Sequence, residues 1–202
     1  MLESFLSFSW IEQLALFSGI IYVVLAARES IWCWPWGILS SGLLGYASLT
    51  FYQLYADFGL QMYYVLMGFL GLYQWRFGSQ SKTALPISRM RAREHLVVIV
   101  SGTIVGLFIG YFFDTYTEAA ATYPDALTTS FSIIATLLVV QKKLENWLYW
   151  IVADLAYVVL YSSRGAWLFA LLMVIYTGIA IFGYWQWKKR LNDHLKGAQV
   201  SL

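Results

Sequence analysis

The residues best suited to bind a ligand lie on one face of an apolar and aromatic run, residues 146–162. If this run is a membrane helix, Asp154 lies about 12 Å from its start, and a carboxylate at that depth should face a cavity or a partner. Trp147, Trp150 and Tyr157 share its helix face, at about 100° per residue. A carboxylate among aromatic rings can hold a flat cation by ion pairing and cation–π contact. The alternative is that Trp147 anchors the helix at the interface and Asp154 is protonated or bonded to a neighbouring helix.

A second polar face lies in the run 58–76. Gln61 and Tyr64 share it with two glycines and Trp75. Small residues let helices approach closely, so we expect the glycines to serve packing. Gln61 and Tyr64 can donate hydrogen bonds, and we expect them to contact substrate; a hydrogen bond between helices is the alternative.

The composition identifies the environment of these faces. Of 202 residues, 60% are hydrophobic and 12% are charged, whereas soluble domains have roughly 45–50% and 25%. The chain is therefore expected to be a polytopic membrane protein. The net charge of +2 gives no indication of nucleic-acid binding, and the single Cys33 excludes an internal disulfide framework.

Several classes of function lack the residues they need. The sequence has no Gly-rich phosphate loop, no nucleophile–base pattern and no cluster of metal ligands. We therefore expect no enzyme activity, no catalytic residues, no metal and no cofactor. Two isolated histidines, His95 and His194, have no partners at metal-ligand spacing.

Seven apolar runs predict seven transmembrane helices in an all-α protein. They lie near 11–27, 32–52, 58–76, 95–113, 125–141, 146–162 and 166–187. Of the thirteen Lys and Arg, all but Arg164 then fall on one side. Because short basic loops stay in the cytoplasm, the N-terminus is predicted outside and the C-terminus inside.

The sequence also contains a weak internal repeat. Phe17-Ser18 recurs as Phe131-Ser132 and Arg28 as Lys142, both 114 residues later, while Tyr64 recurs as Tyr176 after 112. These matches predict two parallel three-helix bundles joined by a linker helix, a 3+1+3 arrangement that resembles the sugar-transporting SWEET proteins. The predicted parts are a first bundle (1–76), a basic cytoplasmic loop (77–94), a linker helix with an outer loop (95–124), a second bundle (125–187) and a cytoplasmic tail (188–202).

In this repeat Trp36 corresponds to Trp150 at an offset of 114. Trp36 is expected either to close the binding site from the opposite bundle or to lie at the interface. Ser40 and Ser41 follow it, and they either hydrogen-bond locally or line the pathway.

The chain resembles the PnuC family of bacterial vitamin-precursor transporters. The segments that carry the resemblance are 53–61 (QLYADFGLQ), 71–75 (GLYQW) and 145–154 (ENWLYWIVAD). The last fits the family pattern Trp-x-x-Trp-x-x-x-Asn/Asp, so the resemblance implies that Trp147, Trp150 and Asp154 contact substrate and that Gln61 donates a hydrogen bond. It also implies facilitated diffusion of nicotinamide riboside, trapping by a cytoplasmic kinase, and a homotrimer in the bacterial inner membrane.

The sequence does not distinguish between several substrates. Family members tied to nicotinamide riboside often have Asn in place of Asp154, and related members carry thiamine or riboflavin. Nicotinamide riboside and thiamine both contain a ring cation, which Asp154 and the tryptophan pair suit equally. A membrane sensor or scaffold is the alternative from another class.

Overall fold

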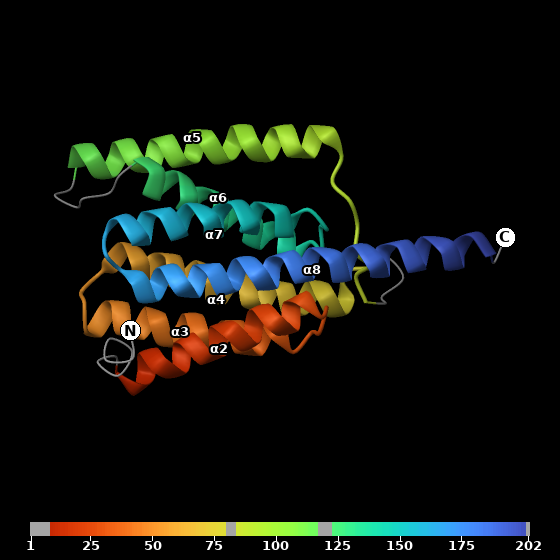
Figure 1. Cartoon of the computed structure of the whole chain (residues 1–202), viewed down its shortest axis with the longest axis horizontal. Coiled ribbons are helices and arrows are strands. Elements are labelled where there is room, and N and C mark those ends of the chain that lie inside the picture. Colours follow the sequence, from red (N-terminus) through yellow and green to blue (C-terminus); the bar gives the residue numbers. More distant parts are fainter. Residues whose placement is uncertain (1–8, 80–83, 117–122, 201–202) are drawn as a thin grey trace.

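The computed structural model describes residues 9–79, 84–116 and 123–200, and within these ranges the chain forms seven helices (Figure 1). In chain order they are α2 (Trp10–Ala27), α3 (Cys33–Thr50), α4 (Tyr55–Phe77), α5 (Ala92–Tyr116), α6 (Tyr123–Val140), α7 (Asn146–Ser163) and α8 (Trp167–Val200). The prediction of seven helices in an all-α protein is confirmed.

Local signals explain several boundaries. At the start of α2, the Ser9 side chain accepts from the Glu12 backbone N–H and the Glu12 carboxylate accepts from that of Ser9, which is a capping box. Glu12 thus has a structural role at the helix start. Helix α8 continues without a break to Val200, well beyond the other helices, and so includes most of the predicted tail (188–202) (Figure 1).

Four of the seven helices are long and apolar enough, by length and composition, to cross a membrane: α2, α5, α6 and α8. The other three are less apolar because they carry polar and aromatic side chains, among them Ser41 of α3, Gln61 of α4 and Asp154 of α7. These same three residues line a central cavity.

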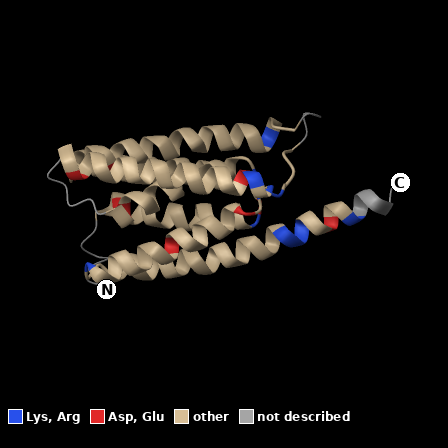
Figure 2. Cartoon of the chain, turned by 90° about the horizontal axis from the view of Figure 1, so that it is seen from above, with Lys and Arg blue, Asp and Glu red and all other residues tan. Residues whose placement is uncertain are grey.

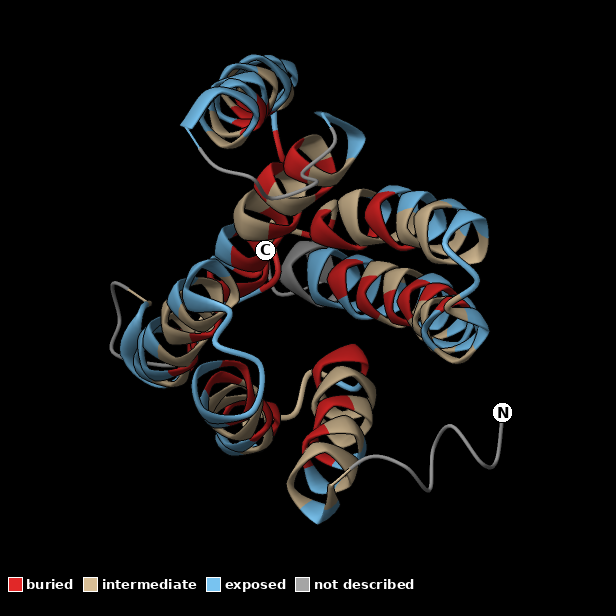
Figure 3. Cartoon of the chain, turned by 90° about the vertical axis from the view of Figure 1, so that its left-hand side faces the viewer, coloured by how far each residue is buried: buried red, intermediate tan, exposed pale blue. Residues whose placement is uncertain are grey.

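The helices form two groups. Helices α2, α3 and α4 pack together, as do α6, α7 and α8, and the groups meet where α2 contacts α8 and α4 contacts α6. Helix α5 lies at the edge of the molecule and packs mainly against α6 (Figures 1 and 3). These contacts are the ones expected of a parallel repeat in which α2 corresponds to α6 and α4 to α8.

The backbone repeats at an offset of 113 in the first two helices of each group, which corrects the predicted offset of 114. Helices α2 and α6 start at 10 and 123, and the turns that follow place Glu29 and Lys142 at positive φ, 60° and 50°. A shift of one residue turns a helical position by about 100°, so identity matches alone do not fix the register. Trp36 consequently corresponds to Tyr149, and Trp150 corresponds to Gly37.

Charge separates the two ends of the molecule. Basic side chains gather at one end and along the projecting part of α8 (Figure 2), and we call this the basic end. Its described basic residues include Arg28, Arg76, Lys142, Lys143, Lys188, Lys189 and Arg190. Arg164 lies at the opposite end, after α7. Lys82, which the sequence places on the basic side, lies outside the described residues.

The segment that joins the two groups is held at the basic end. The backbone N–H of Ser88 donates to the Lys142 carbonyl at 3.0 Å, and its carbonyl accepts from Leu144 at 2.8 Å. Lys143 pairs with Glu94 at 2.9 Å. The predicted basic loop therefore packs against the turn between α6 and α7.

Candidate binding cavity

A cavity of about 210 Å³ lies between the two helix groups. Five residues predicted to contact substrate line it: Gln61, Tyr64, Trp147, Trp150 and Asp154. They come from α4 on one side and α7 on the other, so the structure brings together the two polar faces identified in the sequence.

Asp154 supplies the charge of this cavity. It is only 4% exposed, and among the described residues no hydrogen bond or ion pair involves it. The described ion pairs lie at the ends of the helices, as with Arg164 and Asp125 at 3.2 Å. A buried carboxylate without a partner is costly, and a cationic ligand in the cavity would supply the missing partner.

The two tryptophans of α7 have different surroundings. Trp147 is 2% exposed, packs edge-on against Trp187 with ring centroids 5.5 Å apart, and covers Gly183. Its indole N–H has no hydrogen-bond partner. Trp150 is half-buried and lines the cavity. Trp147 is thus both a wall of the cavity and part of the packed interior, whereas Trp150 serves mainly the cavity.

The glycines of α4 serve packing, as expected. A side chain on Gly71 would meet the Trp34 ring, and one on Gly68 would meet Ile38. Trp34 corresponds to Trp147 at the offset of 113, and Gly71 corresponds to Gly183 at 112. Each group therefore presses a buried tryptophan of its second helix onto a glycine of its third.

Two predicted contacts do not line the cavity. Tyr157 stacks on Tyr161 with centroids 5.6 Å apart and lies 3.4 Å from the Thr129 hydroxyl, toward the opposite end from the basic one. Trp36 is half-buried outside the cavity wall. Tyr157 lies beyond Asp154 on α7, where the helix has already left the cavity. Because the offset between the two groups is 113, Trp36 does not occupy the position that corresponds to Trp150.

Other residues complete the cavity wall. Tyr22 of α2 and Tyr176 of α8 line it and were not predicted with the site. Ser41 of α3 was expected either to hydrogen-bond locally or to line the pathway, and it lines the cavity. Tyr176 could have been predicted from the repeat, because it corresponds to Tyr64, 112 residues earlier. Ser41 occupies the position of α3 that corresponds to Asp154 at the offset of 113, so the cavity has a charge on one side and a hydroxyl on the other.

A smaller cavity of about 120 Å³ adjoins the first and shares Tyr22, Ser40, Ser41, Tyr64 and Trp150 with it. Together they form a partly polar, aromatic space of the kind that encloses small ligands. Nothing in its chemistry resembles a metal centre: the described residues contain no group of three His, Cys, Asp or Glu placed to hold an ion.

A partly polar, aromatic cavity between two groups of apolar helices is what a multi-pass membrane transporter of small molecules requires. Residues 9–189 match the family model described as nicotinamide mononucleotide transporter, and the chain belongs to this family.

Individual relatives agree with this assignment. The chain is 28% identical to the nicotinamide riboside transporter PnuC of Escherichia coli, over 89% of this chain and 85% of that protein. It is 26% identical to PnuC of Neisseria mucosa, over 92% and 74%. The riboflavin/roseoflavin transporter RibM of Streptomyces davaonensis is 26% identical, over 88% and 84%. A crystal structure of the vitamin B3 transporter PnuC matches with a TM-score of 0.74 at 26% identity, covering 92% of this chain and 83% of that one.

Proposed function

We propose that this protein takes up nicotinamide riboside across the bacterial inner membrane. The observation that carries the proposal is the unpaired Asp154 beside Trp147 and Trp150 in the central cavity. A pyridinium ring would pair with the carboxylate and stack on indole faces. Among ligands with a cationic ring we choose nicotinamide riboside because the PnuC relatives are named as its transporters.

Thiamine is the second candidate, because its thiazolium ring meets the same requirements. Riboflavin, which the name of the RibM relative suggests, is less well matched. Riboflavin has no cationic ring, so its binding would leave Asp154 buried without a partner.

The mode of transport follows from the same proposal. We infer facilitated diffusion through a protein with no chemical step of its own, with a cytoplasmic kinase that traps the product as a phosphate. A homotrimer is carried over from the family resemblance.

We infer that all seven helices cross the membrane and that the basic end faces the cytoplasm. Its support is the concentration of Lys and Arg at that end (Figure 2), since basic loops are retained inside. Reporter fusions after Gln80 and at the C-terminus should both report the cytoplasm. A split result would contradict both the orientation and the seven spans.

Calorimetry on the purified protein tests the substrate. Wild type should bind nicotinamide riboside or thiamine more tightly than riboflavin. Trp150→Ala should lose about 1–2 kcal/mol of cation–π energy, or about tenfold in affinity, and Trp150→Phe should lose less because a ring face remains. Asp154→Asn should weaken cationic ligands while sparing neutral ones.

Asp125→Asn is the matched control, because Asp125 pairs with Arg164 outside the cavity. It should bind as wild type does. If Asp154→Asn binds every cationic candidate as well as wild type does, the charge argument fails. Binding without substrate accumulation in vesicles that contain the kinase would indicate a sensor instead of a transporter.

A further inference from the structure

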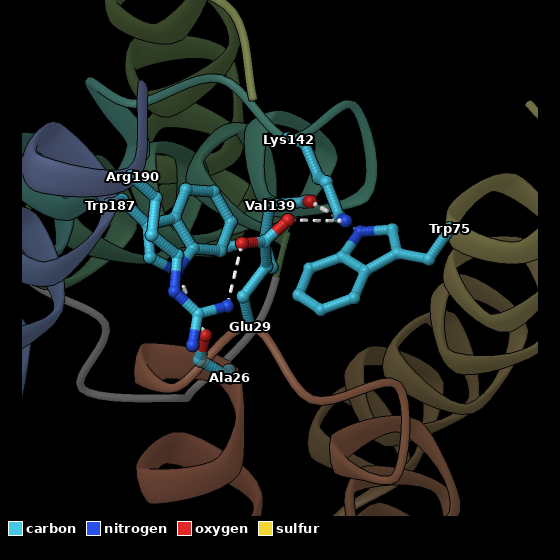
Figure 4. Close-up of polar contacts among 7 residues, drawn as sticks. All are labelled: Ala26, Glu29, Trp75, Val139, Lys142, Trp187 and Arg190. Atoms are coloured by element: carbon cyan, nitrogen blue, oxygen red, sulfur yellow. Dashed lines mark hydrogen bonds and ion pairs between the residues drawn. The ribbon is translucent and has the colours of Figure 1, made fainter. Parts of the chain in front are cut away.

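Two reciprocal hydrogen bonds join the helix groups at the basic end (Figure 4). The indole N–H of Trp75, on α4, donates to the Val139 carbonyl at the end of α6 at 3.0 Å. The indole N–H of Trp187, on α8, donates to the Ala26 carbonyl at the end of α2, also at 3.0 Å. Both tryptophans are buried and their rings touch, with centroids 5.7 Å apart. Each group therefore holds the first helix of the other.

These bonds lie directly at the cavity. Ala26 and Val139, whose carbonyls accept them, are both part of the cavity wall. The two tryptophans thus bond to the cavity wall on its side toward the basic end.

Charged side chains reinforce the same junction (Figure 4). Glu29, in the turn after α2, accepts from Lys142 at 2.8 Å and from Arg190 of α8 at 2.8 Å. The Lys142 ammonium also lies 4.6 Å from the centre of the Trp75 ring. Lys142 is 4% exposed, and hydrogen bonds to charged groups of this kind stabilise more than neutral ones.

The polar contacts at the opposite end are arranged differently. Glu12 of α2 bonds Tyr52 in the turn after α3, and Asp125 of α6 bonds Arg164 in the turn after α7. Each of these joins elements of a single group. The groups also share a bond from the Tyr63 hydroxyl to the Ile133 carbonyl at 2.8 Å, which lies deeper in the helices.

We propose that Glu29, Lys142, Arg190, Trp75 and Trp187 form the cytoplasmic gate of the transport pathway, which this structure holds closed. The inference rests on the proposed function and orientation. We call these five residues the basic-end gate. Transport requires the gate to open, and separation of Glu29 from its two basic partners frees the helix groups to move apart.

Cys33 is a built-in reporter of gate opening. It is the only cysteine of the chain, it is 0% exposed, and it belongs to the buried cluster that contains Trp75 and Trp187. A membrane-impermeant maleimide should label it slowly in wild type. In Glu29→Gln, labelling from the basic end should be roughly tenfold faster, as expected for the loss of a charge-assisted hydrogen bond.

The control is Glu12→Gln, which removes the same charge from the opposite end and should leave Cys33 labelling unchanged. Arg190→Gln removes only the more exposed partner of Glu29 and should give a smaller acceleration. The exchange Glu29→Lys with Lys142→Glu rebuilds a pair between the same positions and should return labelling toward the wild-type rate. Should Glu29→Gln fail to fold, Arg190→Gln and the exchange still decide the matter.

Labelling is carried out on right-side-out and inverted vesicles without substrate, so it does not depend on what the protein transports. Fast labelling in one vesicle orientation only, but from the unexpected side, would refute the orientation and leave the gate intact. Equal labelling of wild type, Glu29→Gln and Arg190→Gln would overturn the gate. So would fast labelling of wild type.

Discussion

At the scale of single residues, Asp154 and Ser41 divide the cavity into a charged and a neutral side. They occupy corresponding positions of α7 and α3, and both line the same space. A substrate with a cationic ring and a hydroxylated remainder would satisfy both sides in one orientation. The asymmetry of an otherwise repeated site can therefore set the orientation of the bound molecule.

Moving the charge tests this relation. Asp154→Ser should weaken binding of nicotinamide riboside by about 1.5–3 kcal/mol, the value of a hydrogen bond to a charged group, or roughly ten- to a hundredfold. Combining it with Ser41→Asp restores one carboxylate on the opposite wall and should recover a large part of that affinity in calorimetry. If the double variant binds no better than Asp154→Ser, the two positions are not equivalent.

Much of this chemistry was predictable from residue types, and some was not. The helical periodicity of residues 146–162 placed Trp147, Trp150 and Asp154 on one face, and all three line the cavity. Tyr157 shares their face but lies too far along the helix. Ser41 could not be matched to Asp154 because the correct offset depends on the backbone of the turns, which identity matches do not reveal.

At the scale of helices, the contact of Gly183 with Trp147 sets how closely α8 approaches α7. A Cβ at Gly183 would lie 2.7 Å from the Trp147 ring, which is itself packed against Trp187. Gly183→Ala should therefore destabilise the protein by about 1–3 kcal/mol, the usual cost of overpacking. Thermal unfolding in detergent measures the loss.

The matched control lies on the same helix. Gly178 is exposed, and a Cβ there would meet no atom within 4 Å. Gly178→Ala should be neutral or stabilise by up to about 1 kcal/mol, because alanine restricts the unfolded chain. Equal effects at the two positions would mean that the close approach to Trp147 does not limit packing.

The turns between helices carry a predicted pH dependence. Burial alone would raise the pKa of the Glu29 carboxyl, but hydrogen bonds from Lys142 and Arg190 outweigh it and hold that pKa below its usual range. Stabilisation by Glu29 is therefore complete above the ordinary carboxyl pKa and is lost as pH falls through the lowered one.

Wild type should accordingly melt at a higher temperature than Glu29→Gln at neutral pH. The difference should shrink only when the pH falls below about 4.5, the ordinary value for this group. Melting curves of both proteins over a pH series measure it, and a difference that is the same at all pH values would show that the Glu29 charge does not matter.

At the scale of the whole molecule, the sequence predicted the helices and their ends better than the junction between the two groups. Apolar runs and basic loops are local signals, and the structure follows them closely. The basic-end gate depends on partners far apart in the chain, such as Trp187 and Ala26, which are separated by 161 residues. Trp75 and Trp187 stand 112 residues apart, at the same offset as Tyr64 and Tyr176, but their hydrogen bonds to opposite groups follow only from the way the groups meet.

The placement of charge through the molecule also predicts how transport is driven. The described acids that form ion pairs lie at helix ends, and Asp154 is the acid of the central cavity. If the substrate itself pairs with Asp154, that carboxylate is occupied in each transport cycle, and neither cavity contains a second acid or a Lys that could carry a proton or sodium ion alongside it. Purified protein in liposomes should therefore equilibrate nicotinamide riboside with all ion gradients collapsed. A proton or sodium gradient imposed with the membrane potential held at zero should change neither the initial rate nor the final level. Accumulation above the external concentration in vesicles without the kinase would reveal coupling to an ion and would require Asp154 to bind that ion as well as the substrate.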